Sequence, residues 1–485
     1  MQANRFTRVP MFQRTRLQRR HAMLALGTIV AIAVFLQHLS LQCAHTGSLQ
    51  HGKRAELRAV PGLAAIATRW FMPPLTGLPS DAWRPMIFRD CYAGMPLDWA
   101  PCLDVHGIQL AEEVVYPDFR ILLPRYIDPS HEEVLEITLL NKPCANRRDK
   151  AHIHYLNQHG RNFIFEDAVY QGTPPAGWGP GACMDSEMVH LGAFTQQADH
   201  AHLPSHDFVM FAASPDSYSF QHFIDRVTVM LAQTSHLRNA NMDFITLQPR
   251  SASVLNMWQM LANASQKQLL APSPVRAKAL LLACDAPLWH PYNLLRTAEM
   301  LVQMSGADPK GHSTSARKVI VTLPRNDGSE KNGGRRWLNY DECAIALQVA
   351  LDERGNHETV KQYKASEYSS FAESIRFFNE NVRLIIGMHG GGMYNAMWVS
   401  ADTPVIELRP KMGGQAHGGT LFWELSSIKN LTYWTVPVAT TGGSMDAIVD
   451  CKLIVRVVKT ALEDKPDPRG AALKTWYQGR FQPGF

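Results

Sequence analysis

The stretch Leu384-Ile-Ile-Gly-Met-His-Gly-Gly-Gly-Met-Tyr-Asn395 is the part of this 485-residue chain that decides its fold class. The apolar run 384–386 predicts a buried strand, and residues 393–399 predict the first turns of a helix. Glycines between a strand and a helix let an anion approach the backbone, where amides at the helix start point toward it. The spacing is neither the dinucleotide fingerprint nor a P-loop, so a tight turn that needs small residues is the alternative.

Segments on both sides of this stretch alternate between predicted strands and helices. Residues 403–408 predict the next strand, which ends near Glu407, and residues 318–323 predict an earlier one. Further helices are predicted over 219–231, over 291–304, from Asn339 to Gly355 and from Ser370 onward, and further strands over 208–212 and 277–283. This alternation predicts a parallel, doubly wound sheet, whose ligands bind beyond the carboxyl ends of the strands.

A strand, a glycine turn, a helix and a strand that ends in a carboxylate suit a sugar nucleotide. The glycine amides would bind the diphosphate, and Glu407 would accept hydrogen bonds from the ribose hydroxyls. A salt bridge from Glu407 to Arg409 is the alternative. His389 either donates to a phosphate or sugar hydroxyl or is a core histidine, and Asn395 either contacts the ligand or holds the loop.

The composition is that of a globular protein without a nucleic-acid partner. Charged residues make up 19% and aromatic residues 9% of the chain, and the net charge is +5. Six arginines and no acidic residue precede residue 22, so this tail accounts for the whole positive excess.

The N-terminal segments predict a membrane anchor. Residues 22–36 are apolar and uncharged, and the apolar run continues to residue 41 behind the basic tail. The positive-inside rule then predicts a cytosolic tail at 1–21, a transmembrane signal anchor at 22–41 and a lumenal stem at 42–80. A cleaved signal peptide or a mitochondrial presequence are the alternatives.

The rest of the chain is long enough for two domains. We expect an acceptor-side domain over 81–300 and a nucleotide-sugar domain with a C-terminal tail over 301–485, the tail after Cys451 crossing back. Eight cysteines suit an oxidising compartment, and Cys91 with Cys102 is the first expected pair. Two N-glycosylation sequons begin at Asn263 and Asn430, as expected for a lumenal chain.

Several motifs together resemble the signature of glycosyltransferase family 61. They are His389-Gly-Gly-Gly-Met-Tyr-Asn395, Pro404-Val-Ile-Glu407 with Pro410, Phe220-Gln-His-Phe-Ile-Asp225, and Lys318–Arg325 followed by Arg335-Arg336-Trp-Leu-Asn339. The likeness covers about residues 210–435. Members of the family include plant β-1,2-xylosyltransferases, arabinosyl- or xylosyltransferases of xylan, and animal enzymes that add N-acetylglucosamine to EGF repeats or to O-mannose.

The resemblance implies an inverting transfer and a GT-B-like fold, in which two Rossmann-like, doubly wound domains face each other across a cleft. It implies a lumenal, single-pass type II enzyme of the Golgi or endoplasmic reticulum. A UDP-sugar that carries xylose, arabinose or N-acetylglucosamine would be the donor, and a glycan or glycoprotein the acceptor. The alternatives are a non-catalytic glycan-binding pseudo-transferase and another lumenal transferase such as a sulfotransferase.

The expected site residues follow from the matched motifs. His222 and Asp225, which share one helix face, are the candidates for deprotonating the acceptor. A buried His-Asp pair that only positions the helix is the alternative. Donor binding is expected from Arg325, Arg335, Arg336, His389, Gly390, Gly391, Gly392, Asn395 and Glu407. A surface ion pair is the alternative for each arginine. Asn326 stands where the family usually has a basic residue, so one cation is lost.

No obligatory metal cofactor is expected. The chain has no DxD motif, and the loose variant Asp185-Ser-Glu187 is interpreted as a solvated turn. Arginines and backbone amides would stabilise the diphosphate leaving group in place of a metal ion.

Overall fold

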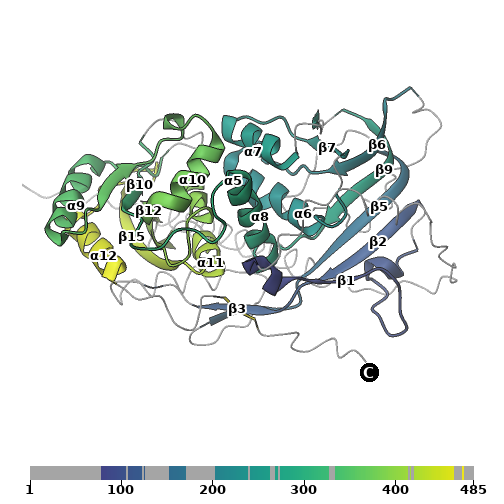
Figure 1. The fold of residues 1–485 in the computed structure, drawn as a ribbon, viewed down its shortest axis with the longest axis horizontal. Coiled ribbons are helices and arrows are strands. Elements are labelled where there is room, and N and C mark those ends of the chain that lie inside the picture. The colour runs from purple at the N-terminus through teal and green to yellow at the C-terminus, as the bar shows by residue number, and fades with distance from the viewer. Residues whose placement is uncertain are drawn as a thin grey trace, which may run out of the picture. The chain divides into compact units, whose positions relative to one another are not determined.

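The computed structural model describes residues 78–104, 107–122, 125, 152–170, 202–238, 241–262, 268–270, 273–326, 334–412, 415–416, 420–463 and 472–474. The predicted tail, the predicted anchor, nearly all of the predicted stem and Asp185–Glu187 lie outside these ranges. Within them, no helix combines the length and the apolar character that a membrane span requires. The described residues form a mixed α/β structure, drawn in Figure 1.

The first sheet has seven strands, and it is mixed. Its order is β1 (Met86–Phe88), β2 (Ile108–Val115), β5 (His159–Tyr170), β9 (Val275–Cys284), β6 (Ser205–Phe211), β7 (Asp243–Thr246) and β8 (Gln268–Leu270). The strands from β9 to β8 are parallel, whereas β1, β2, β5 and β9 pair antiparallel. The predicted strands 208–212 and 277–283 are confirmed as β6 and β9, but the purely doubly wound prediction holds only for the parallel part.

Strand β2 lies in a region that the sequence pattern left as irregular. Its Glu112 and Glu113 are fully buried, which conceals the strand from a hydrophobicity pattern. Glu112 accepts hydrogen bonds from Arg89 at 2.8 Å and is bonded to His236 at 2.8 Å. Glu113 accepts from the Ala100 amide at 2.8 Å. These partners compensate for burying two carboxylates.

The second sheet is the predicted parallel one. It runs in the order β11 (Thr359–Gln362), β10 (Val319–Leu323), β12 (Val382–Met388), β13 (Pro404–Met412) and β15 (Thr432–Thr441), with β14 (Gln415–Ala416) and β16 (Asp446–Ala447) antiparallel at its margin. The strands predicted at 318–323, 384–386 and 403–408 are confirmed as β10, β12 and β13. The chain reverses its winding between β10 and β12, so their adjacent carboxyl ends form the topological switch point.

Helices cover both faces of the second sheet. Helices α9 (Tyr340–Arg354) and α12 (Cys451–Glu463) share one apolar core with the sheet, and a disulfide between Cys343 and Cys451 joins them. Helices α10 (Phe371–Asn381) and α11 (Leu421–Ile428) pack into the core on the other face. The predicted pair Cys91–Cys102 is also confirmed.

Two predicted helix starts have different outcomes. Ser370 caps α10 by accepting from the Glu373 amide at 3.2 Å, while the Glu373 carboxylate accepts from the Ser369 amide at 2.8 Å. Asn339 makes no capping bond to α9. Its side chain instead bonds both backbone groups of Val449 at 2.9 Å, because the chain before α12 passes beside it.

A third, small sheet joins distant parts of the chain. Strand β17 (Ala472–Lys474) pairs with β3 (Phe119–Leu122), which pairs with β4 (His152–Tyr155). The chain after α12 therefore returns to an N-terminal segment, as predicted for the tail.

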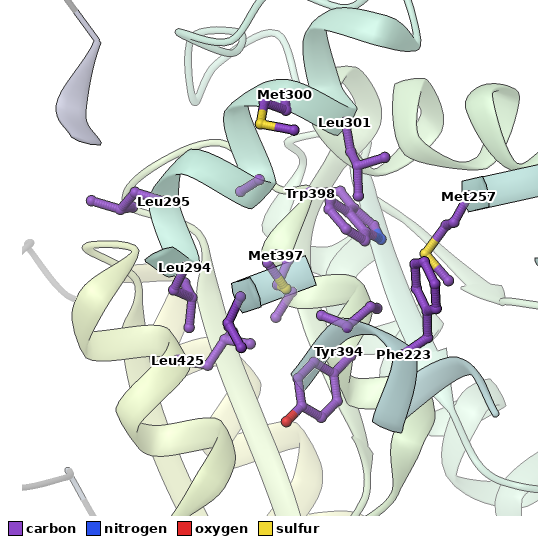
Figure 2. Packing of buried hydrophobic residues seen from close by; sticks show 14 of the residues in the cluster. Phe223, Met257, Leu294, Leu295, Met300, Leu301, Tyr394, Met397, Trp398 and Leu425 are labelled. Atoms are coloured by element: carbon purple, nitrogen blue, oxygen red, sulfur yellow. The ribbon is translucent and has the colours of Figure 1, made fainter. Parts of the chain in front are cut away.

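One apolar core contains buried residues from helices of both α/β parts. It includes α7 (Ala252–Ala262) and α8 (Pro291–Met304), the helical run 220–233 and the short helix η6 (Gly391–Met397). Figure 2 shows Tyr394, Met397 and Trp398 packed among Phe223, Leu294 and Leu301. The helix after the glycine turn is therefore an interior element, with its first residues at the edge of the sheet.

Candidate functional site

The candidate site begins at the switch point of the second sheet. Leu323, the last residue of β10, pairs with Gly387 of β12, so Arg325 and His389 leave the sheet side by side. Arg325 has φ 61° and donates from Nε to the Gly334 carbonyl at 3.3 Å. An added Cβ at Gly390 would lie 2.2 Å from Nη1 of Arg325. Glycine at 390 therefore leaves the space that the Arg325 guanidinium occupies.

The helix after the glycines differs from the prediction. We expected an α-helix over 393–399, whereas η6 is a 3₁₀-helix over Gly391–Met397. Its residues from Met393 to Met397 are all buried, so tertiary packing sets its geometry. Asn395 donates from Nδ2 to the Gly392 carbonyl at 2.9 Å, and this bond within the loop is the supporting alternative for Asn395.

His389 is held from inside the sheet. Its Nδ1 is hydrogen-bonded to the carboxylate of Glu407, and its side chain is 10% exposed. The other carboxylate oxygen of Glu407 accepts from the hydroxyl of Tyr433. Burial raises the pKa of Glu407, but His389, Arg409 and the Tyr433 hydroxyl outweigh this and bring the pKa below its usual value. Both carboxylate oxygens of Glu407 are therefore bonded to protein groups. In this structure Glu407 orients His389, whereas we expected Glu407 to contact the ribose.

The two adjacent arginines have different surroundings. The guanidinium of Arg336 donates two bonds to Asp446, from Nη2 at 2.7 Å and from Nε at 3.1 Å. These bonds hold the pKa of Asp446 at about 2. Arg335 is half-buried, has φ 58°, and its Nε finds no hydrogen-bond partner. Arg335 is thus the better placed of the two to bind an anion, and Arg336 is engaged in an ion pair.

The predicted catalytic pair, His222 and Asp225, contacts helix η6, which follows the glycine turn. The chain from Phe220 to Gln233 is one continuous helical run whose middle, η4 (Phe223–Val227), is π-helical. Nδ1 of His222 lies 3.4 Å from Oδ1 of Asp225, as their spacing predicted. The hydroxyl of Tyr394 in η6 donates to Oδ2 of Asp225 at 3.1 Å. The structure thus brings His222 and Asp225 together with the loop that starts at His389.

Three residues of this site were not singled out in the sequence. Tyr394 and Tyr433 each bond a buried carboxylate, and Gln221 lies 3.3 Å from the position of an added Cβ at Gly391. Tyr394 lies inside the decisive stretch, but its partner is 169 residues away, so no local pattern reveals it.

The described part of the chain contains no group of three or more His, Cys, Asp or Glu side chains arranged to hold a metal ion.

Comparison with known proteins agrees with this arrangement. Residues 220–406 match the model of the family described as glycosyltransferase 61. No curated protein matches the chain. The matched range begins at the helix that carries His222 and Asp225 and ends in β13, so it contains every predicted site residue except Glu407. Tyr433 and Asp446 also lie outside it. The match over residues 220–406 therefore supports an assignment to glycosyltransferase family 61.

Proposed function

We propose that this chain is an inverting glycosyltransferase that transfers a sugar from a UDP-sugar to a hydroxyl group of a glycan or glycoprotein. The observation that carries the proposal is the geometry at the switch point. There, the guanidinium of Arg325 lies against Gly390, directly before a helix that contacts the predicted catalytic pair. A cation and a helix start at such a site are what a nucleotide diphosphate requires.

On the donor side, Arg325 and Arg335 bind the diphosphate. Both residues lie at the carboxyl edge of the second sheet. The Arg325 side chain donates to the carbonyl of Gly334, the residue before Arg335. The first amides of η6 add donors, because a helix start leaves them without intrahelical partners. The diphosphate is stabilised by these groups without an obligatory metal ion. His389 is held through Nδ1 by Glu407, and in its doubly protonated form it donates from its other ring nitrogen to the donor substrate.

On the acceptor side, His222 takes the proton of the attacking hydroxyl while Asp225 orients the imidazole. Inversion by in-line displacement needs such a base. The contact of 3.4 Å between His222 and Asp225 is longer than a standard hydrogen bond, as is common before substrates bind. The donor is a UDP-sugar of xylose, arabinose or N-acetylglucosamine.

The architecture and location that we propose follow from the same assignment. The two α/β parts form a GT-B-like pair that binds donor and acceptor between them. Residues 22–41 anchor the chain in a Golgi or endoplasmic reticulum membrane as a type II protein with the catalytic part in the lumen. Protease treatment of sealed microsomes tests this topology, since digestion of the C-terminal part without detergent would contradict it.

The decisive experiment is a panel of UDP-sugars with the lumenal part of the chain in excess EDTA. We expect UDP and one UDP-sugar to raise the melting temperature and that sugar to be transferred with inversion. Loss of UDP binding in EDTA would contradict the metal-free proposal. Binding of glycans without transfer from any donor would indicate the pseudo-transferase.

A further inference from the structure

A hydroxyl group of the donor-loop helix is bonded to the predicted catalytic pair. The Tyr394 hydroxyl donates to Oδ2 of Asp225 at 3.1 Å, and Oδ1 of the same carboxylate lies 3.4 Å from Nδ1 of His222. Tyr394 and Asp225 are 1% and 3% exposed, so the contact excludes solvent. Tyr394 in η6, Asp225 in η4 and His222 thus form a line, and the side chain of His222 at its end is 26% exposed.

We propose that Tyr394 is the positioning residue of the catalytic base: it fixes the Asp225 carboxylate so that Oδ1 faces His222. This inference rests on the proposed function of the site. The carboxylate then accepts from Nδ1–H of His222, which leaves Nε2 unprotonated and directed to the acceptor hydroxyl. The acceptor proton moves to Nε2 as the hydroxyl oxygen bonds the sugar carbon and the diphosphate leaves.

The surroundings of Asp225 make the tyrosine necessary. The π-helical turn Phe223–Val227 shifts the register of the helix at Asp225, and such insertions occur often at functional sites. Beside Asp225 and Tyr394 lies a cavity of about 10 Å³, room for about one water molecule, whose lining also includes Thr228, Thr297 and Trp289. Without the hydroxyl, the carboxylate has space to rotate away from His222.

The surroundings of Tyr394 keep its hydroxyl protonated, so that it can donate a hydrogen bond. Burial and the adjacent Asp225 carboxylate raise the pKa of Tyr394 well above its usual value. The other charged groups that act here are Arg226, with Nε 3.5 Å from Oδ1 of Asp225, and Glu424, which also raises the pKa of Tyr394. The phenol therefore stays protonated and donates to Asp225 at every pH at which the enzyme would work.

Because Tyr394 belongs to the helix that begins at the glycine loop, it links the two halves of the site. A donor that binds at Gly390 and Gly391 contacts the first turn of η6, and Tyr394 is in the next turn. The base is thus oriented by the same element that receives the diphosphate. Substitution of Tyr394 should reduce turnover without reducing donor affinity.

The test compares Tyr394→Phe with Tyr363→Phe. The Tyr363→Phe substitution also removes one hydrogen bond of a tyrosine hydroxyl, to Ser374 at 2.8 Å, but this bond lies outside the site. We expect Tyr394→Phe to reduce kcat about 10- to 100-fold, the range for one hydrogen bond to a charged group, with KM for the UDP-sugar and UDP affinity unchanged. Tyr363→Phe should leave kcat unchanged. Equal kcat values for both variants, corrected for the folded fraction, would overturn the proposal.

A second measurement is independent of transfer activity. Nitrogen-15 NMR of the His222 ring, assigned with His222→Gln, should show the proton on Nδ1 in the natural protein and a mixture of tautomers in Tyr394→Phe. An identical His222 spectrum in both proteins would also overturn the positioning role. If the natural protein transfers no sugar but the tautomer changes, the proposed function fails and the positioning role stands. If Tyr394→Phe does not fold, Asp225→Asn is compared in the same two measurements, and unchanged kcat and His222 spectrum would again overturn the proposal.

Discussion

The imidazole of His389 is bonded through Nδ1 to the carboxylate of Glu407, which lies inside the sheet on the neighbouring strand. Glu407 is 1% exposed and also accepts from Tyr433 of the next strand, β15. Three adjacent parallel strands thus contribute to the orientation of one histidine at the start of the glycine loop. The loop conformation is set by the interior of the sheet, in addition to its own glycines.

Replacing Glu407 by Gln should lower both stability and donor affinity. The substitution leaves His389 and Arg409 without their buried counter-charge, and breaking such a pair costs about 3–5 kcal/mol of unfolding free energy. The pKa of the carboxyl is depressed in the folded state, so its stabilisation is complete above the ordinary value of 4.5 and is lost as pH falls through the folded value. Chemical denaturation from pH 7 to pH 3 should show the two proteins converging below about pH 4.5.

The matched control for this substitution is Glu112→Gln. Glu112 is also buried, is bonded to His236 at 2.8 Å, and has a lowered pKa because His236, Asn162 and Arg89 outweigh its burial. It lies in the first sheet, away from the glycine loop. Glu112→Gln should lose stability over the same pH range but keep the UDP affinity of the natural protein. Equal loss of UDP affinity in both variants would show that the Glu407 effect is only a general loss of stability.

Arg325→Ala should weaken UDP binding by about 1.5–3 kcal/mol, the range for a charge-assisted hydrogen bond. Arg336→Ala is the control, because its guanidinium is already bonded to Asp446. It should lower stability at neutral pH and leave UDP affinity unchanged, as calorimetry would show. The Arg336 bonds hold the pKa of Asp446 at about 2, so this stability difference should persist to about pH 4 and vanish toward pH 2. Loss of UDP affinity in Arg336→Ala alone would reverse the two assignments.

The sequence predicted those parts of the fold that depend on local patterns. The strands at 318–323, 384–386 and 403–408 are buried runs bounded by turns, and each is present. The helices predicted over 291–304 and from Asn339 to Gly355 are present as α8 and α9. Local patterns cannot predict a conformation that is determined by contacts with residues distant in the sequence.

Two elements show this limit. Residues 391–397 form a 3₁₀-helix because Tyr394 and its neighbours are enclosed by segments from far along the chain. Strand β2 escaped prediction because its two buried glutamates are compensated by Arg89, His236 and the Ala100 amide, none of which is a local neighbour. The resemblance of the motifs placed His222 and His389 in one site, but the tyrosine that links them appears only in three dimensions.

Two disulfides between described residues, Cys343–Cys451 and Cys91–Cys102, should contribute unequally to stability. Cys343–Cys451 closes a loop with a sequence separation of 108, and Cys91–Cys102 closes one with a separation of 11. Loop-closure entropy gives about 5 kcal/mol for the first and about 3 kcal/mol for the second. Paired Cys→Ala substitutions measured by denaturation should follow that order. A larger effect at Cys91–Cys102 would mean that the α9–α12 contact survives in the unfolded chain.

Gly390→Ala tests the central geometric claim, which is that glycine at 390 makes room for Arg325. The added methyl would lie 2.2 Å from Nη1 of Arg325, so the guanidinium must move away. Because Nη1 is the far end of a flexible side chain, we expect a small loss of stability but a loss of UDP affinity similar to that of Arg325→Ala. In the double variant Gly390→Ala/Arg325→Ala, the two effects should not add, since both remove the same interaction.

Gly392→Ala is the matched control, because an added Cβ there meets only Leu323, at an ordinary contact distance of 4.0 Å. It should keep both stability and UDP affinity close to those of the natural protein. If Gly392→Ala weakens UDP binding as much as Gly390→Ala, the loop binds the nucleotide through its backbone alone and Arg325 is not the group displaced. If neither substitution changes UDP affinity while both lower the melting temperature, the three glycines form only a tight turn. The anion site that the decisive stretch predicts would then lie elsewhere on the sheet edge.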